Sequence, residues 1–217
     1  MTVQMLLKAA LRDRLGPSAR RHGFKGSAPT WRKQNADGDW GIVNLQSSSW
    51  SSADRLPCII NVAVAPEPWL RWNRQLLGDS MPKNVTESLG LYRDRLHPTG
   101  TPEGSDRWWE VTDADSAVAA AEDMIDQLET KGWPLLDSLL EPGAMLGQVR
   151  SGSLGDMKRS NLGAFFARAE ALLLMDGGLS AELDECLEHA LREAMPSQRE
   201  NALLFDRWVR EEAGGSA

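Results

Sequence analysis

The 217-residue sequence predicts an α+β protein: an N-terminal helix packed on an antiparallel sheet of about four or five strands, followed by a C-terminal helical region. Three observations predict this class. Apolar residues recur at helical spacing before residue 16, alternate at strand spacing between residues 24 and 111, and return to helical spacing from residue 112. At 41% hydrophobic and 25% charged residues, the chain is long enough to bury a substantial core.

The first element is an amphipathic helix that begins at Val3. Its apolar residues follow the i, i+3, i+4, i+7 spacing as far as Leu15. We expect the helix to end by Gly16-Pro17, or to continue with a kink to Arg21, with Gly23 as its stop.

Three strands are predicted next, over residues 24–33, 40–45 and 58–65. Gly38 lies in the first connection and supplies the positive φ that a tight turn needs. Alternate residues of the third strand are apolar without exception, which predicts one fully buried face. Because parallel strands need a long crossover and these connections are short, the strands should form an antiparallel meander.

The sequence between the meander and residue 141 predicts further short elements. A helix over residues 69–77 precedes two strand candidates, residues 89–97 and 107–111. Thr112 and Asp115 predict the capped start of a helix that Gly132 should end. Pro134 is suited to the first turn of another helix, over residues 135–140.

The C-terminal third is helical in pattern. Residues 142–157 contain several glycines and predict a linker or a loose segment, whereas residues 158–213 predict a helical extension of the domain formed by residues 1–141. Within the extension, helix patterns over residues 161–175 and 181–195 look like one hairpin of the tetratricopeptide type, and a third helix covers residues 198–210. No second copy of the hairpin follows, so the sequence predicts no repeat array.

A series of short motifs has a recognisable order along residues 23–137. The motifs are Gly23-Phe24-Lys25, Thr30-Trp31-Arg32, Val43-Asn44-Leu45-Gln46-Ser47, Trp50-Ser51, Ile60-Asn61-Val62, Arg93-Asp94-Arg95-Leu96, Asp106-Arg107-Trp108-Trp109 and Pro134-Leu135-Leu136-Asp137. In this order and spacing they resemble the bacterial domain-of-unknown-function 4304 family over about residues 4–141. The resemblance implies a helix packed on an antiparallel sheet with helices after it, and it transfers no active site.

The cysteines and the apolar segments predict a cytoplasmic protein. Cys58 and Cys186 are the two cysteines and lie far apart in sequence, so no disulfide framework is implied. The N-terminal residues lack the apolar core of a signal peptide, and no stretch approaches the roughly 18 apolar residues of a membrane span. We therefore expect no membrane partner.

Charge is distributed unevenly between the two halves. Residues 1–112 hold 15 basic and 11 acidic residues, and residues 113–217 hold 9 basic and 20 acidic residues. The net charge is −7 and the isoelectric point is about 5.1. Single-strand nucleic-acid binders use positively charged grooves, so this composition argues against a nucleic-acid partner.

Polar and aromatic side chains of the predicted sheet, and of the helix after it, are the candidate binding residues. Amides in central strands either line a polar patch or hold strand register. Tryptophans interleaved with arginines either grip a ligand or supply core area while the arginines reach solvent. The candidates are Arg32, Asn44, Gln46, Asn61, Trp69, Arg71, Arg93, Arg95, Arg107 and Trp108.

Catalytic and metal sites have little support in the sequence. Cys58 lies on the apolar face of its strand, where an inert thiol is expected. His22, His97 and His189 are isolated, without the paired spacing of metal ligands. No Gly-rich phosphate loop and no serine nucleophile motif is present, so we expect no catalytic residue, no metal and no cofactor.

The sequence therefore favours a non-catalytic protein-interaction module with a protein partner. The alternative is a binder of a small anionic or nucleotide-like ligand, or an enzyme, that uses a sheet face lined by arginines and amides. A deep pocket with converging arginines would favour the alternative. A third reading, a structural subunit of an oligomer, would appear as a stable dimer by light scattering.

Overall fold

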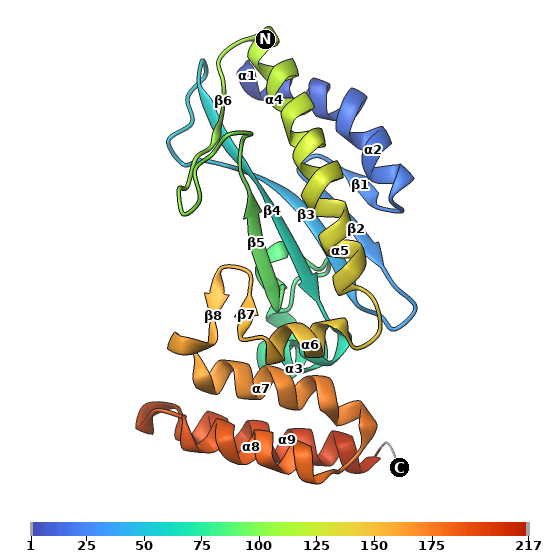
Figure 1. The fold of residues 1–217 in the computed structure, drawn as a ribbon, viewed down its shortest axis with the longest axis vertical. Coiled ribbons are helices and arrows are strands. Elements are labelled where there is room, and N and C mark those ends of the chain that lie inside the picture. Colours follow the sequence, from blue (N-terminus) through green and yellow to red (C-terminus); the bar gives the residue numbers. More distant parts are fainter. Residues whose placement is uncertain (1, 216–217) are drawn as a thin grey trace.

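The computed structural model describes residues 2–215, apart from the side chain of Asn161. Within these residues a six-stranded antiparallel sheet carries helices on one face, and a layer of helices packs against its lower end (Figure 1). The strands of the sheet are β1 (Lys25–Ser27), β2 (Thr30–Gln34), β3 (Trp40–Ser47), β4 (Leu56–Ala65), β5 (Tyr92–Leu96) and β6 (Trp109–Val111), and a separate hairpin is formed by β7 (Ser153–Leu154) and β8 (Met157–Lys158). The helices are α1 (Val3–Ala10), α2 (Gly16–Arg21), α3 (Glu67–Leu77), α4 (Ala114–Gln127), α5 (Trp133–Leu139), α6 (Ala144–Arg150), α7 (Gly163–Leu174), α8 (Ala181–Arg192) and α9 (Arg199–Gly215). The α+β prediction is confirmed.

The N-terminal helix runs without a break from Val3 to Arg21, so it continues past Gly16 and Pro17. A π-helical turn over Leu11–Leu15 joins α1 to α2. This wider turn lies just before Pro17, which has no N–H and whose ring clashes with the preceding turn of a regular α-helix. The chain stays helical, and Leu11 and Leu15 stay buried in the main core.

The sheet is the predicted meander with one extra strand at its start. The strand order is β1-β2-β3-β4-β5, all neighbours are antiparallel, and β6 pairs with the first residues of β4 beyond the end of β5. The strand expected over residues 24–33 is two strands, because Ala28 and Pro29 form a turn between β1 and β2. Pro29 cannot donate a hydrogen bond to a strand ladder, which favours the turn there.

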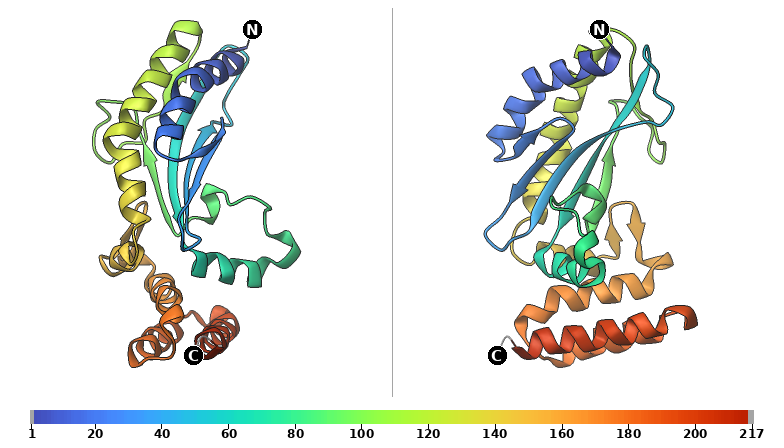
Figure 2. Two further views of the ribbon diagram at one scale, coloured as in Figure 1. Left: turned by 90° about the vertical axis from the view of Figure 1, so that its right-hand side faces the viewer. Right: turned by 180° about the vertical axis from the view of Figure 1, so that it is seen from behind.

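The central strand β4 divides the molecule into a covered face and an uncovered face. Its alternate residues from Leu56 to Val64 are at most 2% exposed and join the main core beneath the helices. Figure 2 (left) shows the sheet nearly edge-on, with α1, α2, α4 and α5 on one side. On the other side, α3 and the segment after it reach only the lower part of the sheet.

The start of α4 differs from the prediction by one residue. Asp113, and not Thr112, is the N-cap: its carboxylate accepts a hydrogen bond from the Ser116 backbone N–H at 2.8 Å. Ser116 Oγ in turn accepts one from the Asp113 backbone N–H at 2.9 Å. Asp113 is the N-cap because a capping box needs, three residues after the N-cap, a side chain that bonds back to the N-cap N–H. Ser116 stands three residues after Asp113 and provides that bond.

Gly132, expected to end this helix, lies inside it. A π-helical turn over Leu128–Gly132 joins α4 to α5, and Pro134 follows it as Pro17 follows the first π-helical turn. A Cβ on Gly132 would lie 2.7 Å from the Leu128 side chain and 3.0 Å from the Leu96 side chain of β5. Gly132 therefore lets the helix pack closely on the sheet, and its role is packing rather than termination.

Residues 142–157, expected as a linker or loose segment, fold into α6 and most of the β7–β8 hairpin. The hairpin docks on the edge of β5, where the Asp156 N–H donates to the Arg93 carbonyl oxygen at 2.9 Å. Gly155 permits this approach: its φ is +72°, and a Cβ there would lie 1.9 Å from the same oxygen. The helical layer is thus attached to the sheet through backbone contacts.

The C-terminal helices form a second core below the sheet. It includes Leu172 of α7, Leu187 of α8 and Phe205 of α9, all buried. Trp72 of α3 joins this core, with its ring 4.9 Å from that of Phe205. None of the helices within residues 2–215 is both long enough and apolar enough to span a membrane.

Candidate functional site

The face of the sheet turned away from α4 carries most of the predicted binding residues. In the strand register, Asn44 lies opposite Asn61, and Asn61 lies opposite Arg95, so a polar row crosses β3, β4 and β5. Side chains two residues apart on a strand share a face, which adds Gln46 and Arg93. We call this surface the open face; of the predicted residues it contains Arg32, Asn44, Gln46, Asn61, Arg93, Arg95 and Trp108.

The lower part of the open face is covered by α3 and the segment after it. Ile42, Ala63 and Leu70 are fully buried there in a small apolar cluster. Arg32 donates from Nε to the carbonyl oxygen of Val85, so its guanidinium anchors this covering segment. The upper part, around the first half of β4, has no helix over it (Figure 2).

The amides of the open face bond to one another across the strands. Asn44 Nδ2 donates to Thr30 Oγ1 at 2.9 Å, which joins β3 to β2. Asn61 Nδ2 donates to Gln46 Oε1 at 3.0 Å, which joins β4 to β3. These bonds support strand register, and they leave the Gln46 NH₂ group directed to the surface, where Gln46 is exposed.

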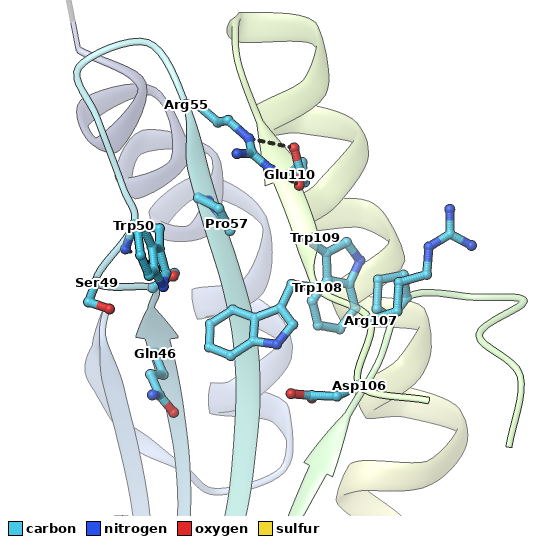
Figure 3. A pocket seen from close by; sticks show the side chains of 12 residues that line it. Gln46, Ser49, Trp50, Arg55, Pro57, Asp106, Arg107, Trp108, Trp109 and Glu110 are labelled. Carbon is cyan, nitrogen blue, oxygen red and sulfur yellow. Dashed lines mark hydrogen bonds and ion pairs between the residues drawn. The ribbon is translucent and has the colours of Figure 1, made fainter. Parts of the chain in front are cut away.

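A broad hollow of about 910 Å³ lies at the upper end of the open face. Its walls are the loop between β3 and β4 on one side and residues 106–110 on the other, with Gln46 and Pro57 between them. Trp50, on the loop, is 84% exposed. Figure 3 shows the Trp108 ring extending across β4 toward the side on which Trp50 lies.

The carboxylates at the rim of the hollow are paired with arginines. Arg55 Nε donates to a carboxylate oxygen of Glu110 at 2.9 Å, and a second nitrogen contacts the other oxygen (Figure 3). The hydrogen bond from Arg55 holds the pKa of Glu110 below its ordinary value. Arg95 bonds both oxygens of Asp106 at 3.2 Å. The Arg95 guanidinium carbon also lies 5.9 Å from the centre of the Trp108 ring.

Trp109 fixes the segment that carries Trp108. Successive strand residues point to opposite faces, so Trp109 points toward α4, where Nε1 donates to Asp123 Oδ2 at 2.7 Å. Asp123 also accepts hydrogen bonds from the hydroxyl and the N–H of Thr99. Burial alone would raise the pKa of Asp123, but the bonds from Thr99 and Trp109 hold it below its ordinary value. The aromatic pair is therefore held by one buried anchor and presents one ring to the hollow.

Two predicted binding residues lie elsewhere, on α3. Trp69 Nε1 donates to the Leu89 carbonyl oxygen at 2.9 Å, and its ring centre is 5.4 Å from that of Phe165 on α7. Arg71 forms ion pairs with Asp176 and with Glu212 of α9. Both side chains join α3 to the helical layer and are remote from the hollow. Arg107, in contrast, lines the hollow and is exposed.

Cys58 and His97, each next in sequence to a residue that lines the hollow, carry the thiol and the imidazole that catalysis or metal binding could use. Cys58 points to the covered face, and burial raises the pKa of its thiol to about 12. His97 Nδ1 lies 3.0 Å from the Arg107 carbonyl oxygen and 4.0 Å from Asp106. Within residues 2–215 no group of three or more His, Cys, Asp or Glu side chains is placed to hold a metal ion.

Sequence reasoning did not select Trp50, Arg55, Asp106 or Glu110 as site residues. Trp50 lies in a serine-rich loop, where no periodic pattern distinguishes a buried from an exposed tryptophan. Arg55 and Glu110 are 55 residues apart and meet only because β6 pairs with β4. The one available signal for Trp50 was its occurrence in a loop, where binding residues are common.

The fold and this surface define a class: an α+β sheet protein with one face sealed by helices and the other presenting tryptophans, amides and arginines. A family model described as Domain of unknown function (DUF4304) matches residues 15–138, more than half of the chain. The chain belongs to this family, as the order of motifs predicted. The match covers the whole open face and ends within α5, before the helical layer. No curated protein and no solved structure matches the chain.

Proposed function

We propose that this chain is a non-catalytic, cytoplasmic protein-interaction module that binds its partner on the open face. The exposed Trp50 beside the half-buried Trp108 is the observation that carries the proposal. Isolated exposed apolar residues are common, but a tryptophan pair over a hollow is typical of interaction sites, where tryptophan and arginine contribute most of the binding energy.

The charge arrangement also supports a protein partner. Arg55 and Arg95 are bonded to carboxylates of the same rim, so they do not converge on a single point in the hollow. A small-anion site would need several unpaired cations aimed at one ligand. The hollow is also broad and open to solvent, whereas small-molecule sites enclose most of the surface of the ligand. The anion-binding alternative has correspondingly less support.

The test is whether a partner is retained through the open face. Tagged protein is incubated with lysate of the cells that produce it, and bound proteins are identified by cross-linking and mass spectrometry. We expect a reproducible partner that Trp50→Ala loses. The matched control is Leu203→Ala, since Leu203 is also an exposed apolar residue, 48% exposed, but lies on α9 far from the hollow.

The purified partner should then bind the wild-type chain and the Leu203→Ala variant with equal affinity in calorimetry. Retention that is unaffected by Trp50→Ala, or lost equally in the Leu203→Ala variant, contradicts the proposal. Turnover of a small substrate that depends on Arg95 or Arg107 would instead support the alternative.

A further inference from the structure

One side of α9 is an uncovered helix surface, at the end of the molecule opposite the hollow. Figure 2 (right) shows α9 along its length at the lower end, in front of α8 and with no element over it. The inner side of the helix carries buried residues of the second core, among them Phe205 and Val209. At 3.6 residues per turn, the opposite side is a stripe of exposed residues: Glu200, Leu203, Leu204, Arg207 and Glu211. We call these five residues the outer stripe.

Two adjacent leucines lie in the middle of the outer stripe. Leu203 is 48% exposed and Leu204 is 42% exposed. A hollow of about 440 Å³ follows the helix beside them, from Leu203 to Glu211. Single exposed leucines are common on protein surfaces. Two neighbouring leucines beside a hollow, on a helix side that no other element covers, provide apolar area that a second helix can bury.

The charges of the outer stripe are arranged symmetrically about the two leucines. Glu200 lies three residues before Leu203, and Arg207 lies three residues after Leu204. At a rise of about 1.5 Å per residue, each charge lies about 5 Å along the helix axis from the midpoint of the leucines. Within the part of the chain that the structure describes, Glu200 and Arg207 form no ion pair. Their opposite charges therefore face outward on either side of an apolar centre.

We propose that the outer stripe binds the outer stripe of a second copy of this chain, with the two α9 helices antiparallel. The two-fold axis passes between Leu203 and Leu204, so each Leu203 contacts Leu204 of the second copy. The same symmetry places each Glu200 opposite Arg207 of the second copy. A parallel pair would instead place like charges side by side, Glu200 beside Glu200 and Arg207 beside Arg207. The charge pattern therefore favours an antiparallel copy of the same helix.

The leucines supply the attraction, and the ion pairs set the orientation. Exposed ion pairs contribute little to stability in water, but like charges at the same positions oppose association. One pair of helices buries less area than a stable interface requires, so we expect a weak dimer with a Kd of about 10–100 µM. The outer stripe lies beyond residues 15–138, which match the family, and it does not include the open face. This inference is therefore independent of the proposed function.

The test is sedimentation equilibrium of the full chain over a concentration range of about 5 to 300 µM. Arg207→Glu and Glu200→Arg each replace two attractive pairs with two repulsive pairs. The double variant Glu200→Arg/Arg207→Glu exchanges the charges and restores attraction. An equimolar mixture of the two single variants also restores it, because each chain then meets the opposite charge. Arg107→Glu is the control for net charge, since Arg107 is also an exposed arginine but lies at the open-face hollow.

We expect each single charge variant, and Leu203→Ala, to associate at least about tenfold more weakly than the wild type. The double variant and the mixture should associate within about threefold of the wild type, and Arg107→Glu should be unchanged. Thermal unfolding of each variant shows whether it is folded. A wild-type chain that stays monomeric at 300 µM overturns the inference. So does association that the charge reversals leave unchanged, or that neither the double variant nor the mixture restores.

Discussion

The two faces of the sheet use the same strands but different side chains. On the covered face, alternate β4 residues such as Ile60 and Val62 are apolar and at most 1% exposed. On the open face, the intervening Asn61 is half-buried and hydrogen-bonded to Gln46, and Trp50 at the rim is 84% exposed. Because strand residues alternate in direction, one set packs beneath the helices, whereas on the other set Ala63 and Ala65 are buried beside α3 and Asn61 is half-buried. Substitutions should therefore affect stability on the covered face and binding around the hollow of the open face.

The largest effect is expected on the covered side, from Trp133→Ala. Trp133 is fully buried, its ring centre lies 4.7 Å from that of Phe24, and its Nε1 donates to Ser18 Oγ at 3.3 Å. Removal of the ring leaves a cavity and removes the hydrogen bond that the Ser18 hydroxyl accepts, so we expect a loss of about 3–5 kcal/mol in the free energy of unfolding, measured by urea denaturation. A loss below about 1 kcal/mol would mean that the covered face is not the main source of stability.

We expect an intermediate loss of stability from a substitution at the edge of β5, where the sheet meets the helical layer. Gly155→Ala places a methyl group against the Arg93 carbonyl oxygen at a positive φ, and we expect it to cost about 1–3 kcal/mol. The displaced hairpin should become sensitive to limited proteolysis near residues 150–160. Gly147→Ala is the matched control, since Gly147 lies in α6 with open space around it and should be neutral or slightly stabilising. Equal proteolysis of both variants would contradict the docking role of Gly155.

A smaller effect, dependent on pH, is expected where the N-terminal helix meets the long helix of the covered face. Glu129 accepts hydrogen bonds from Ser18 and Arg21, and its second oxygen lies 2.9 Å from His22 Nε2. The bond from Ser18, with His22 and Arg21, holds the pKa of Glu129 below its ordinary value of 4.5. A carboxyl group with a lowered folded-state pKa stabilises the fold above pH 4.5, and this contribution is lost as pH falls through the folded-state pKa.

Glu129→Gln should therefore lower stability by about 1 kcal/mol at pH 7 and much less at pH 3. Unfolding by urea at the two pH values measures the difference. Glu122→Gln is the control, because Glu122 is more exposed and contacts one arginine, Arg14. If the free energy of unfolding changes between pH 7 and pH 3 by the same amount in the wild type and in Glu129→Gln, Glu129 does not contribute to the pH dependence of stability.

The smallest effect on stability is expected from Trp50→Ala on the open face. Its ring is 84% exposed, so the change in unfolding free energy should stay within about 0.5 kcal/mol. The same variant should lose the partner, which would separate the two faces most clearly. Calorimetric unfolding and partner retention are measured on one preparation. A variant that unfolds more readily by more than about 1 kcal/mol would show that Trp50 is part of the core.

Local sequence pattern predicted the covered face well. Alternation in β4 and the 3.6-residue spacing of α1 and α4 follow from backbone geometry, which is the same in any context. A prediction was wrong where one residue type, glycine, can either end a helix or allow close packing within one. Gly132 was read as a helix stop, but it is a packing position against Leu96, a residue 36 positions earlier in the sequence. Only the folded chain shows that neighbour.

Part of the candidate site was also predictable from local sequence pattern. Once the meander was assigned, strand alternation placed Asn44, Asn61 and Arg95 on one face, and the register brought them side by side. Trp69 and Arg71 carry the same residue types but lie on α3 against the helical layer, because their contacts are Phe165 and Asp176, about 100 residues away.

The sequence by itself thus determined the class of fold, the family and the apolar face of each strand, since these depend on neighbours within a few residues. The tertiary structure alone decided which polar face stays open. Helices placed by distant residues cover one side of the sheet fully and the other only at its lower end, and this leaves Trp50 and Trp108 at the surface. Coverage depends on long-range packing, which local periodicity does not encode.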